Sequence, residues 1–283
     1  MQRLRLYHVN IELHGVLLFS SRVYPAGGRA RGVAEETAPI IHNYPLIYAF
    51  NGVPVESYGV VPCLHYASYG AMKTPAGGRL EYPLVEEAVR CLAAPGLEPR
   101  CPIYAYPAAP LRLSSVKLFF SARTDSYGEY RGKLKTVFPR TVTHIGFGPG
   151  SQFEAFIVSA EPLPSVVYSR LGMKRLGSFR AVLEEARVVG RVGDGYSSHP
   201  VNIGDVETWG ARLLDRVVLF ETRSPPYRGG KPCPSCARVG YVRGEMYIVE
   251  WSDHVMKRRR RALLPLPPGA WEAPPRRRVE PAW

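Results

Sequence analysis

A strict alternation of apolar and polar residues near the N-terminus is the strongest constraint on how this chain folds. In "LYHVNIELH", the apolar residues Tyr7, Val9, Ile11 and Leu13 alternate with His8, Asn10, Glu12 and His14. A period of two predicts a β-strand with one buried and one solvated face. His8 and Glu12 would be roughly 13 Å apart on the solvated face, which is too far for one metal ion. The pattern therefore favours a solvated or RNA-facing sheet surface over a metal site.

Three segments carry helix signals. In "IIHNYPLIYAFNG" (40–52), Asn43 suits the N-cap position and Gly52 can end the helix. Residues 82–96 combine an apolar stripe with a Pro-Gly stop, and residues 178–190 follow a serine that can act as a cap. The first strand, a loop and the 43–52 helix would together begin a βαβ unit.

The remaining elements predicted from the pattern are strands. "QFEAFIVS" (152–159) reads as a core strand, and "DRVVLFET" (215–222) as a late one. Residues 237–251 predict two strands joined by a turn at Arg243-Gly244. The pattern therefore indicates an α+β protein.

Residues 117–142 predict a basic, hairpin-like insertion. The segment mixes the cations Lys133, Lys135 and Arg140 with the aromatic residues Tyr127 and Tyr130. Such interleaving suits a single strand of nucleic acid, because rings stack on bases while cations follow the backbone. A solvated hairpin explains the same composition, so both interpretations stay open here.

Charge distinguishes two parts of the chain. The 283 residues carry a formal net charge of +13. Residues 255–283 hold eight Lys and Arg against two Glu, with many prolines and few apolar residues, which predicts a flexible tail after a single domain at 1–254. Both parts are basic, which favours a polyanionic partner.

Five cysteines are too few for a disulfide framework in a chain of this length. Cys233 and Cys236 form a CxxC pair, which is half of a tetrahedral zinc site. Cys63, Cys91 and Cys101 offer no second pair with matching spacing. We therefore expect no metal, and keep Cys233 and Cys236 as a weak candidate pair in a loop or in a site completed by another chain.

Motifs for catalysis are missing from the sequence. It contains no nucleophile elbow, P-loop, HExxH or paired-carboxylate motif. A metal-independent ribonuclease needs only a base, an acid and a cation, so His42, Tyr44 and Lys174 leave that alternative open. No signal peptide and no apolar run of membrane-spanning length occurs, so we expect a cytoplasmic protein that uses no membrane.

Four short motifs, in order, resemble one protein family. They are "IELHGVLLFSSRV…ETAPIIHNYPLIYAFNG", "MKTPA" (72–76), "YSRLGMKR" (168–175) and "HPVNIGDV" (199–206). Together they are similar to the signature of the CRISPR subtype I-D effector subunit of the Cas-five group, also called the Csc-one family. Where that signature has "RLGK", this chain has Met173, and Lys174 comes one place later.

The resemblance implies a ferredoxin-like, RNA-recognition-type (RAMP) βαββαβ core with a basic hairpin insertion. It further implies a non-catalytic subunit without a cofactor that binds the 5′ handle of the CRISPR RNA (crRNA). Its partners would be the backbone (Cas-seven-like) subunits, whose filament it caps, and the large (Cas-ten-like) subunit near the PAM of the target DNA. A metal-independent endoribonuclease that processes repeat RNA is the alternative, and a general RNA-associated protein unrelated to CRISPR is a third.

The expected site residues fall into two groups. The residues expected to contact handle phosphates are Arg22, Lys133, Lys135, Arg140, Arg170, Lys174 and Arg175, with Tyr127 and Tyr130 as base-stacking residues. The signature residues expected to have structural roles are His42, Asn43, Tyr44, His199 and Asn202.

Overall fold

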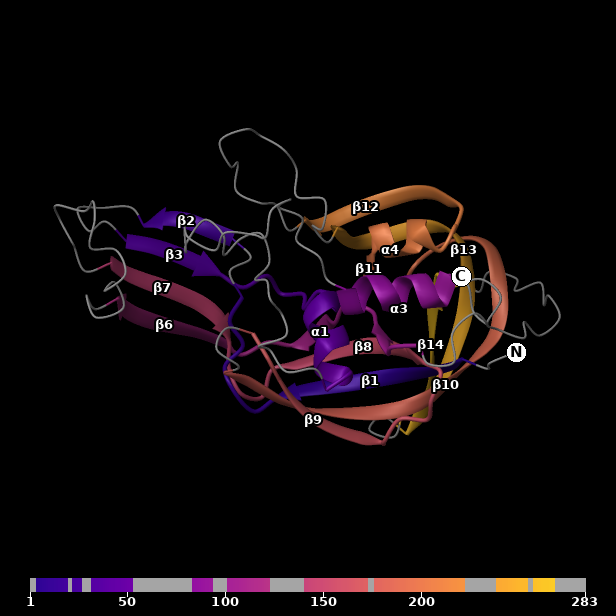
Figure 1. The fold of residues 1–283 in the computed structure, drawn as a ribbon, viewed down its shortest axis with the longest axis horizontal. Helices are drawn as coiled ribbons and strands as arrows, with labels where there is room; N and C mark the ends of the chain where they lie inside the picture. Colours follow the sequence, from indigo (N-terminus) through magenta and orange to yellow (C-terminus); the bar gives the residue numbers. More distant parts are fainter. Residues whose placement is uncertain are drawn as a thin grey trace.

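The computed structural model describes residues 4–19, 22–26, 32–52, 83–93, 101–122, 140–172, 176–221, 238–253 and 257–267. This part of the chain is α+β, with many strands, few helices and a curled antiparallel sheet (Figure 1). The helices are α1 (Asn43–Phe50), α3 (Pro83–Ala93) and α4 (Ile203–Thr208). The strands are β1 (Arg5–Leu13), β2 (Arg22–Ala26), β3 (Gly32–Glu36), β4 (Tyr104–Ala105), β5 (Ala109–Arg112), β6 (Ser115–Ala122), β7 (Arg140–Phe147), β8 (Gln152–Ser159), β9 (Val166–Leu171), β10 (Gly177–Tyr196), β11 (Val201–Asn202), β12 (Leu213–Glu221), β13 (Arg238–Asp253) and β14 (Arg258–Leu264).

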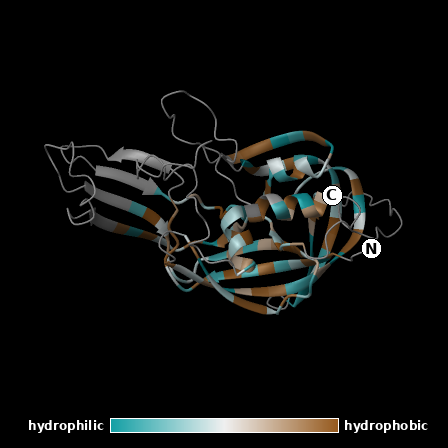
Figure 2. Cartoon of the chain, viewed as in Figure 1, coloured by the Kyte–Doolittle hydropathy of each residue, from teal (hydrophilic) through white to brown (hydrophobic). Residues whose placement is uncertain are grey.

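The larger sheet has ten strands, with the order β11-β13-β10-β1-β8-β4 along its main path. β12 and β14 pair with β13, β5 pairs with β8, and β9 pairs with β10. β1 lies between β8 and β10 and is antiparallel to both. The sheet curls around the three helices (Figure 1), and apolar and polar residues alternate along many of its strands (Figure 2). The predicted strands at β1, β8 and β12 are confirmed, as are the helices α1 and α3.

The long strand β10 produces much of the curl. Its first half pairs with β1 and β9, and its second half pairs with β13 across register shifts between Val188/Gly190 and Val192/Gly195. Such bulges bend a strand and increase its twist. The helix predicted for residues 178–190 is wrong. Phe179, Ala181 and Leu183 are buried at every second position, so pairing on both edges outweighs local helix propensity.

Two predictions for the C-terminal part are also wrong. No turn occurs at Arg243-Gly244, because β13 runs through both residues. The glycine is needed because a Cβ there would lie 2.5 Å from the main-chain oxygen of Arg212 on the neighbouring segment. Residues 258–264 are not a free tail but strand β14, which pairs with β13 and buries Ala262 and Leu264. Residues 268–283 lie outside the described residues.

A second sheet has the strand order β2-β3-β7-β6 and projects from one end of the larger sheet (Figure 1). β6 and β7 pair antiparallel, from Ser115 opposite Phe147 to Ala122 opposite Arg140. These strands include both ends of the segment predicted as a basic hairpin, while residues 123–139 lie outside the described residues. In the described part of the chain, no helix is long and apolar enough to cross a membrane.

Candidate nucleic-acid interface

His42 is the N-cap of helix α1, a position that the sequence assigns to Asn43. Its Nδ1 accepts a hydrogen bond from the backbone N–H of Tyr44 at 3.3 Å, which satisfies one of the free donors of the first turn. The side chain is buried, and this burial lowers the pKa of His42 to about 4. His42 is therefore a neutral ring whose lone pair holds the start of the helix.

Asn43 is not the N-cap; instead, it links two signature motifs that are far apart in sequence. Its Nδ2 donates to Oδ2 of Asp205 at 2.6 Å, and its Oδ1 accepts from Nδ2 of Asn202 at 3.2 Å. The hydroxyl of Tyr104 donates to the same Asp205 oxygen at 2.9 Å. All four side chains are buried. The network therefore holds α1, β4 and α4 together through hydrogen bonds shielded from water.

Burial controls the protonation of this network. Desolvation raises the pKa of Asp205 to about 7, although hydrogen bonds from Tyr104, Asn43 and Asn202 act in the opposite direction. Desolvation also raises the pKa of Tyr104 well above its usual value, and the nearby Asp205 adds to this. Asp205 is thus a buried carboxyl that titrates close to neutral pH.

His199 and Tyr44 complete the set of signature residues. Nε2 of His199 lies 2.7 Å from the carbonyl oxygen of Pro107, and its ring packs edge-on against Phe156 with centroids 5.1 Å apart. Burial lowers the pKa of His199 to about 4. Tyr44 is half-buried against the ring of His42, with centroids 5.4 Å apart. Each signature residue is therefore engaged in packing or hydrogen bonding within the fold.

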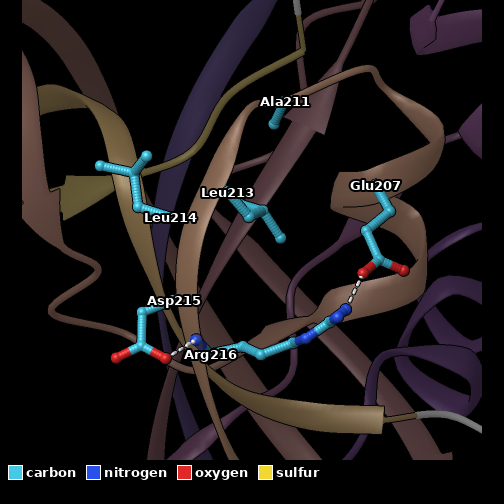
Figure 3. Close-up of a pocket in the computed structure, with 6 residues that line it drawn as sticks. All are labelled: Glu207, Ala211, Leu213, Leu214, Asp215 and Arg216. Atoms are coloured by element: carbon cyan, nitrogen blue, oxygen red, sulfur yellow. Dashed lines mark hydrogen bonds and ion pairs between the residues drawn. The ribbon is translucent and has the colours of Figure 1, made fainter.

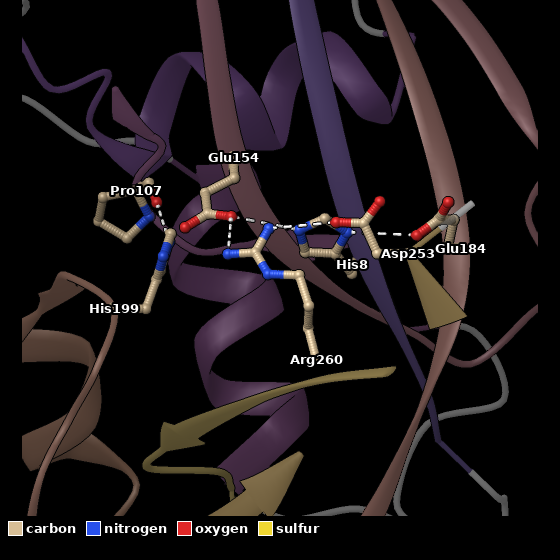
Figure 4. Close-up of polar contacts among 7 residues, drawn as sticks. All are labelled: His8, Pro107, Glu154, Glu184, His199, Asp253 and Arg260. Atoms are coloured by element: carbon tan, nitrogen blue, oxygen red, sulfur yellow. Dashed lines mark hydrogen bonds and ion pairs between the residues drawn. The ribbon is translucent and has the colours of Figure 1, made fainter. Parts of the chain in front are cut away.

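His8 is buried, although the alternation in β1 predicts a solvated position. The curl of the sheet brings β13 over this end of β1, and Trp251 stacks on the His8 ring with centroids 4.4 Å apart. Nε2 of His8 lies 3.5 Å from Oε2 of Glu154, and Nδ1 lies 3.6 Å from Oε2 of Glu184 (Figure 4). The polar residue is accommodated between two carboxylates instead of by water.

Arg260 of β14 closes this cluster. Its guanidinium lies 3.3 Å from Glu154 and 3.4 Å from Asp253 (Figure 4). It also covers the ring of Trp251. Burial alone would raise the pKa of Glu154, but the hydrogen bond with His8 and nearby positive charges, including Arg260, hold it below its usual value. Charge pairing therefore ties the last described strand to β8 and β13.

An open pocket of about 370 Å³ lies between α4 and β12. Its lining residues are Glu207, Ala211, Leu213, Leu214, Asp215 and Arg216. Arg216 reaches across to form an ion pair with Glu207 (Figure 3). Glu207 also forms an ion pair with Arg238 at 2.7 Å. Asp215 accepts from the hydroxyl of Tyr196 and the backbone N–H of Arg216, so the charged groups that line this pocket already have partners within the fold.

The three predicted RNA-contacting residues that the structure describes are dispersed over the fold. Arg170 is exposed on β9. Arg22 begins β2 and Arg140 begins β7, and the strand registers put them at opposite ends of the smaller sheet, roughly 16 Å apart along the strands. The others lie outside the described residues: Lys133, Lys135, Lys174, Arg175, Tyr127 and Tyr130.

Metal chemistry finds no support in the described ranges. No group of three or more His, Cys, Asp or Glu there could hold an ion. Cys233 and Cys236 lie outside those ranges, whereas Cys91 of α3 forms a disulfide with Cys101. This single bond fastens the end of α3 to the chain that leads into β4.

Sequence reasoning missed the groups that complete both buried networks. Asp205 lies within the "HPVNIGDV" motif, which could have identified it, but Tyr104 has only an unremarkable strand context. Arg260 lies in a run of four arginines that reads as a solvated tail. Asp205 bonds to Asn43 and Tyr104, and Arg260 pairs with Glu154 on β8, all of them distant in sequence, so only the folded arrangement reveals these roles.

These features define a strand-rich α+β protein in which the signature residues His42, Asn43, His199 and Asn202 make hydrogen bonds within the fold. The model of one protein family, described as type I-D CRISPR-associated protein Cas5/Csc1, matches residues 4–223. The match covers most of the chain, and the chain therefore belongs to the type I-D Cas5/Csc1 family. No curated protein matches the sequence. Family membership replaces the interpretation as an RNA-associated protein unrelated to CRISPR.

Proposed function

We propose that this protein is a non-catalytic, cytoplasmic subunit of a type I-D CRISPR effector complex that binds the 5′ handle of the crRNA. In that complex it caps the filament of backbone subunits and contacts the large subunit near the PAM. Guide pairing reads the target sequence, so the task of this subunit is to position RNA and its partner subunits.

Family membership, combined with the strong positive charge, carries this proposal. A polyanion is the partner that a net charge of +13 favours. The signature residues support a scaffold role, since Asn43 and Asn202 bond to each other and His42 caps a helix. Arg170 supplies an exposed cation on a strand of the larger sheet.

Salt dependence of RNA binding tests the proposal. If Arg22, Lys133, Lys135, Arg140, Arg170, Lys174 and Arg175 all contact phosphates, the logarithm of the binding constant should fall with log salt with a slope of about −5. The full-length protein would be titrated against labelled handle RNA at several salt concentrations. A slope near zero, or no binding at low salt, contradicts the proposal.

A repeat-cleaving endoribonuclease is the second candidate, because the rings of His42 and Tyr44 lie 5.4 Å apart. Against it, Nδ1 of His42 is occupied by the helix backbone. Incubation of the protein alone with repeat RNA in EDTA separates the two functions. Site-specific cutting that His42→Ala abolishes would establish the enzyme, and intact RNA supports the scaffold.

The finer fold assignment is also proposed. β1 and β4 both lie beside β8 and are antiparallel to it, and α1 and α3 come between β1 and β4 in the chain. This arrangement resembles the first split βαβ half of a ferredoxin-like core, with β10 in the place of its last strand. Between β8 and β10 the chain has strand β9 where that core has its second helix.

A further inference from the structure

One face of strands β9 and β10 is turned away from helix α1. Ser169 Oγ donates to the carbonyl oxygen of Ala49 in α1 at 3.2 Å, and the rings of Phe50 and Phe179 lie 6.0 Å apart. These contacts seat α1 on the face that carries Ser169 and Phe179. Because side chains alternate along a strand, Tyr168, Arg170 and Arg180 project from the opposite face.

On that opposite face, the three side chains are neighbours. Tyr168 of β9 is directly opposite Arg180 of β10, and Arg170 is opposite Ser178. Directly opposite side chains are roughly 5 Å apart, and next-but-one residues on a strand are about 7 Å apart. A cation therefore lies beside the Tyr168 ring in two directions, across the sheet and along the strand.

Tyr168 is unusually open to solvent. It is 69% exposed, the largest fraction among the exposed large hydrophobic side chains of the described residues. Tyr196 of β10 is also exposed, at 46%, but its hydroxyl is bound to Asp215 at 2.8 Å. No such bond to a described residue engages the hydroxyl of Tyr168. Most of the surface of the Tyr168 ring is therefore open to contact with a ligand.

The two arginines beside Tyr168 keep their charge available. Among the described residues, neither Arg170 nor Arg180 forms an ion pair within 4.0 Å. By contrast, Arg191, Arg216 and Arg243 are each paired with a carboxylate. Glu12 of β1 is opposite Arg180 on its other side, and Glu154 on β8 is engaged by His8 and Arg260. The end of the face nearest β9 is therefore positively charged.

We propose that Tyr168 is a base-stacking site for single-stranded RNA, and that Arg170 and Arg180 bind the phosphates on either side of the stacked base. Single-stranded RNA is held by splayed bases on aromatic rings and by cations along the backbone, which matches this arrangement. The site deepens the proposed function and rests on it, since the RNA would be the crRNA handle.

Substitution of Tyr168 tests the stacking. The full-length protein would be titrated with a fluorescently labelled RNA that has the 5′-handle sequence. Tyr168→Ala should weaken binding about 5- to 150-fold, the range that loss of one stacked base produces, while Tyr168→Phe should bind like the wild type. Tyr196→Ala is the matched control and should leave the affinity unchanged, because its ring lies on the other half of β10.

Two arginine variants test the phosphate contacts. Arg180→Gln should make the salt slope shallower by about 0.7, the value for one phosphate on a single strand. Arg243→Gln should leave the slope unchanged, since that side chain is paired with Asp194 at 2.7 Å. Unchanged melting temperatures would show that the variants fold.

The outcomes distinguish the two proposals. Wild-type binding that Tyr168→Ala does not weaken overturns the stacking site while handle binding stands. A Tyr168→Ala protein that binds RNA normally but no longer assembles with its partner subunits would make this face a protein interface and also overturns the site. Failure of the wild type to bind handle RNA overturns both the site and the proposed function.

Discussion

Replacement of the buried carboxyl of Asp205 should change how the stability of the protein depends on pH. Burial raises the pKa of Asp205 from 3.8 to about 7 in the folded state. At any pH between these two pKa values, Asp205 is protonated in the folded protein but ionised in the unfolded chain. Stability from this group is therefore present below pH 4, decreases as the pH rises, and is lost above pH 7.

The size of the effect follows from the shift. A shift of about three units corresponds to roughly 4 kcal/mol in the free energy of unfolding, since each unit is worth 1.36 kcal/mol. Asp205→Asn removes the titration but keeps a side-chain oxygen that can accept from Asn43 and Tyr104. The stability of the wild type relative to this variant should therefore fall by roughly 4 kcal/mol between pH 4 and pH 8.

Urea unfolding of both proteins at several pH values measures this difference. Tryptophan fluorescence is a suitable signal, because Trp209 packs against Tyr104 with ring centroids 5.0 Å apart. Asp194→Asn is the control: the pKa of this exposed carboxyl is lowered by its hydrogen bond with Arg243, so its effect has the opposite sign. Parallel pH profiles for the wild type and Asp205→Asn would refute the reasoning.

Three further substitutions test the packing. Gly240→Ala should unfold or strongly destabilise the protein, because a Cβ at this position would clash with the main-chain oxygen of Val217. Gly193→Ala is the control: its Cβ would meet nothing within 4 Å, so this variant should melt at the temperature of the wild type. In urea titrations, Arg260→Ala should lower the free energy of unfolding by about 1–3 kcal/mol, because Glu154 and Asp253 lose their ion pairs with Arg260. Arg261→Ala is the control and should lower it by less than about 1 kcal/mol, because the Arg261 side chain is exposed. His42→Ala should lower the free energy of unfolding by about 1 kcal/mol, because the helix α1 loses its N-cap. Equal loss of stability in the Gly193 and Gly240 variants, or in the Arg260 and Arg261 variants, would contradict the packing described here.

The hydrophobic pattern of the sequence correctly predicted those elements where it fits only a strand or only a helix. The alternation in β1 and the apolar segment of β8 were sufficient, as were the stripe and Pro-Gly stop that mark α3. Residues 178–190 fit a helix or a strand by local pattern, and only pairing with β1 and β9 makes them a strand. β14 was not predicted, because it is stabilised by pairing with β13, and the local amino-acid composition gives no sign of that pairing.

The buried networks could be predicted only in part. The resemblance marked Asn43 and Asn202 as structural residues, and both are buried in one hydrogen-bond network. Their shared partner Asp205 is 162 residues from Asn43, a separation that local pattern cannot bridge. The prediction of a solvated His8 was wrong for a related reason: its burial depends on Trp251, which the curl of the sheet brings over the His8 ring.

Crosslinking within the assembled type I-D effector tests the central claim most directly. The complex would be reconstituted with crRNA that carries a photoreactive base at each handle position in turn, and crosslinked peptides would be identified by mass spectrometry. We predict crosslinks from the handle to this subunit, including peptides around Tyr168 and Arg170, on uncut crRNA. A complex in which no handle position crosslinks to this subunit would contradict the account.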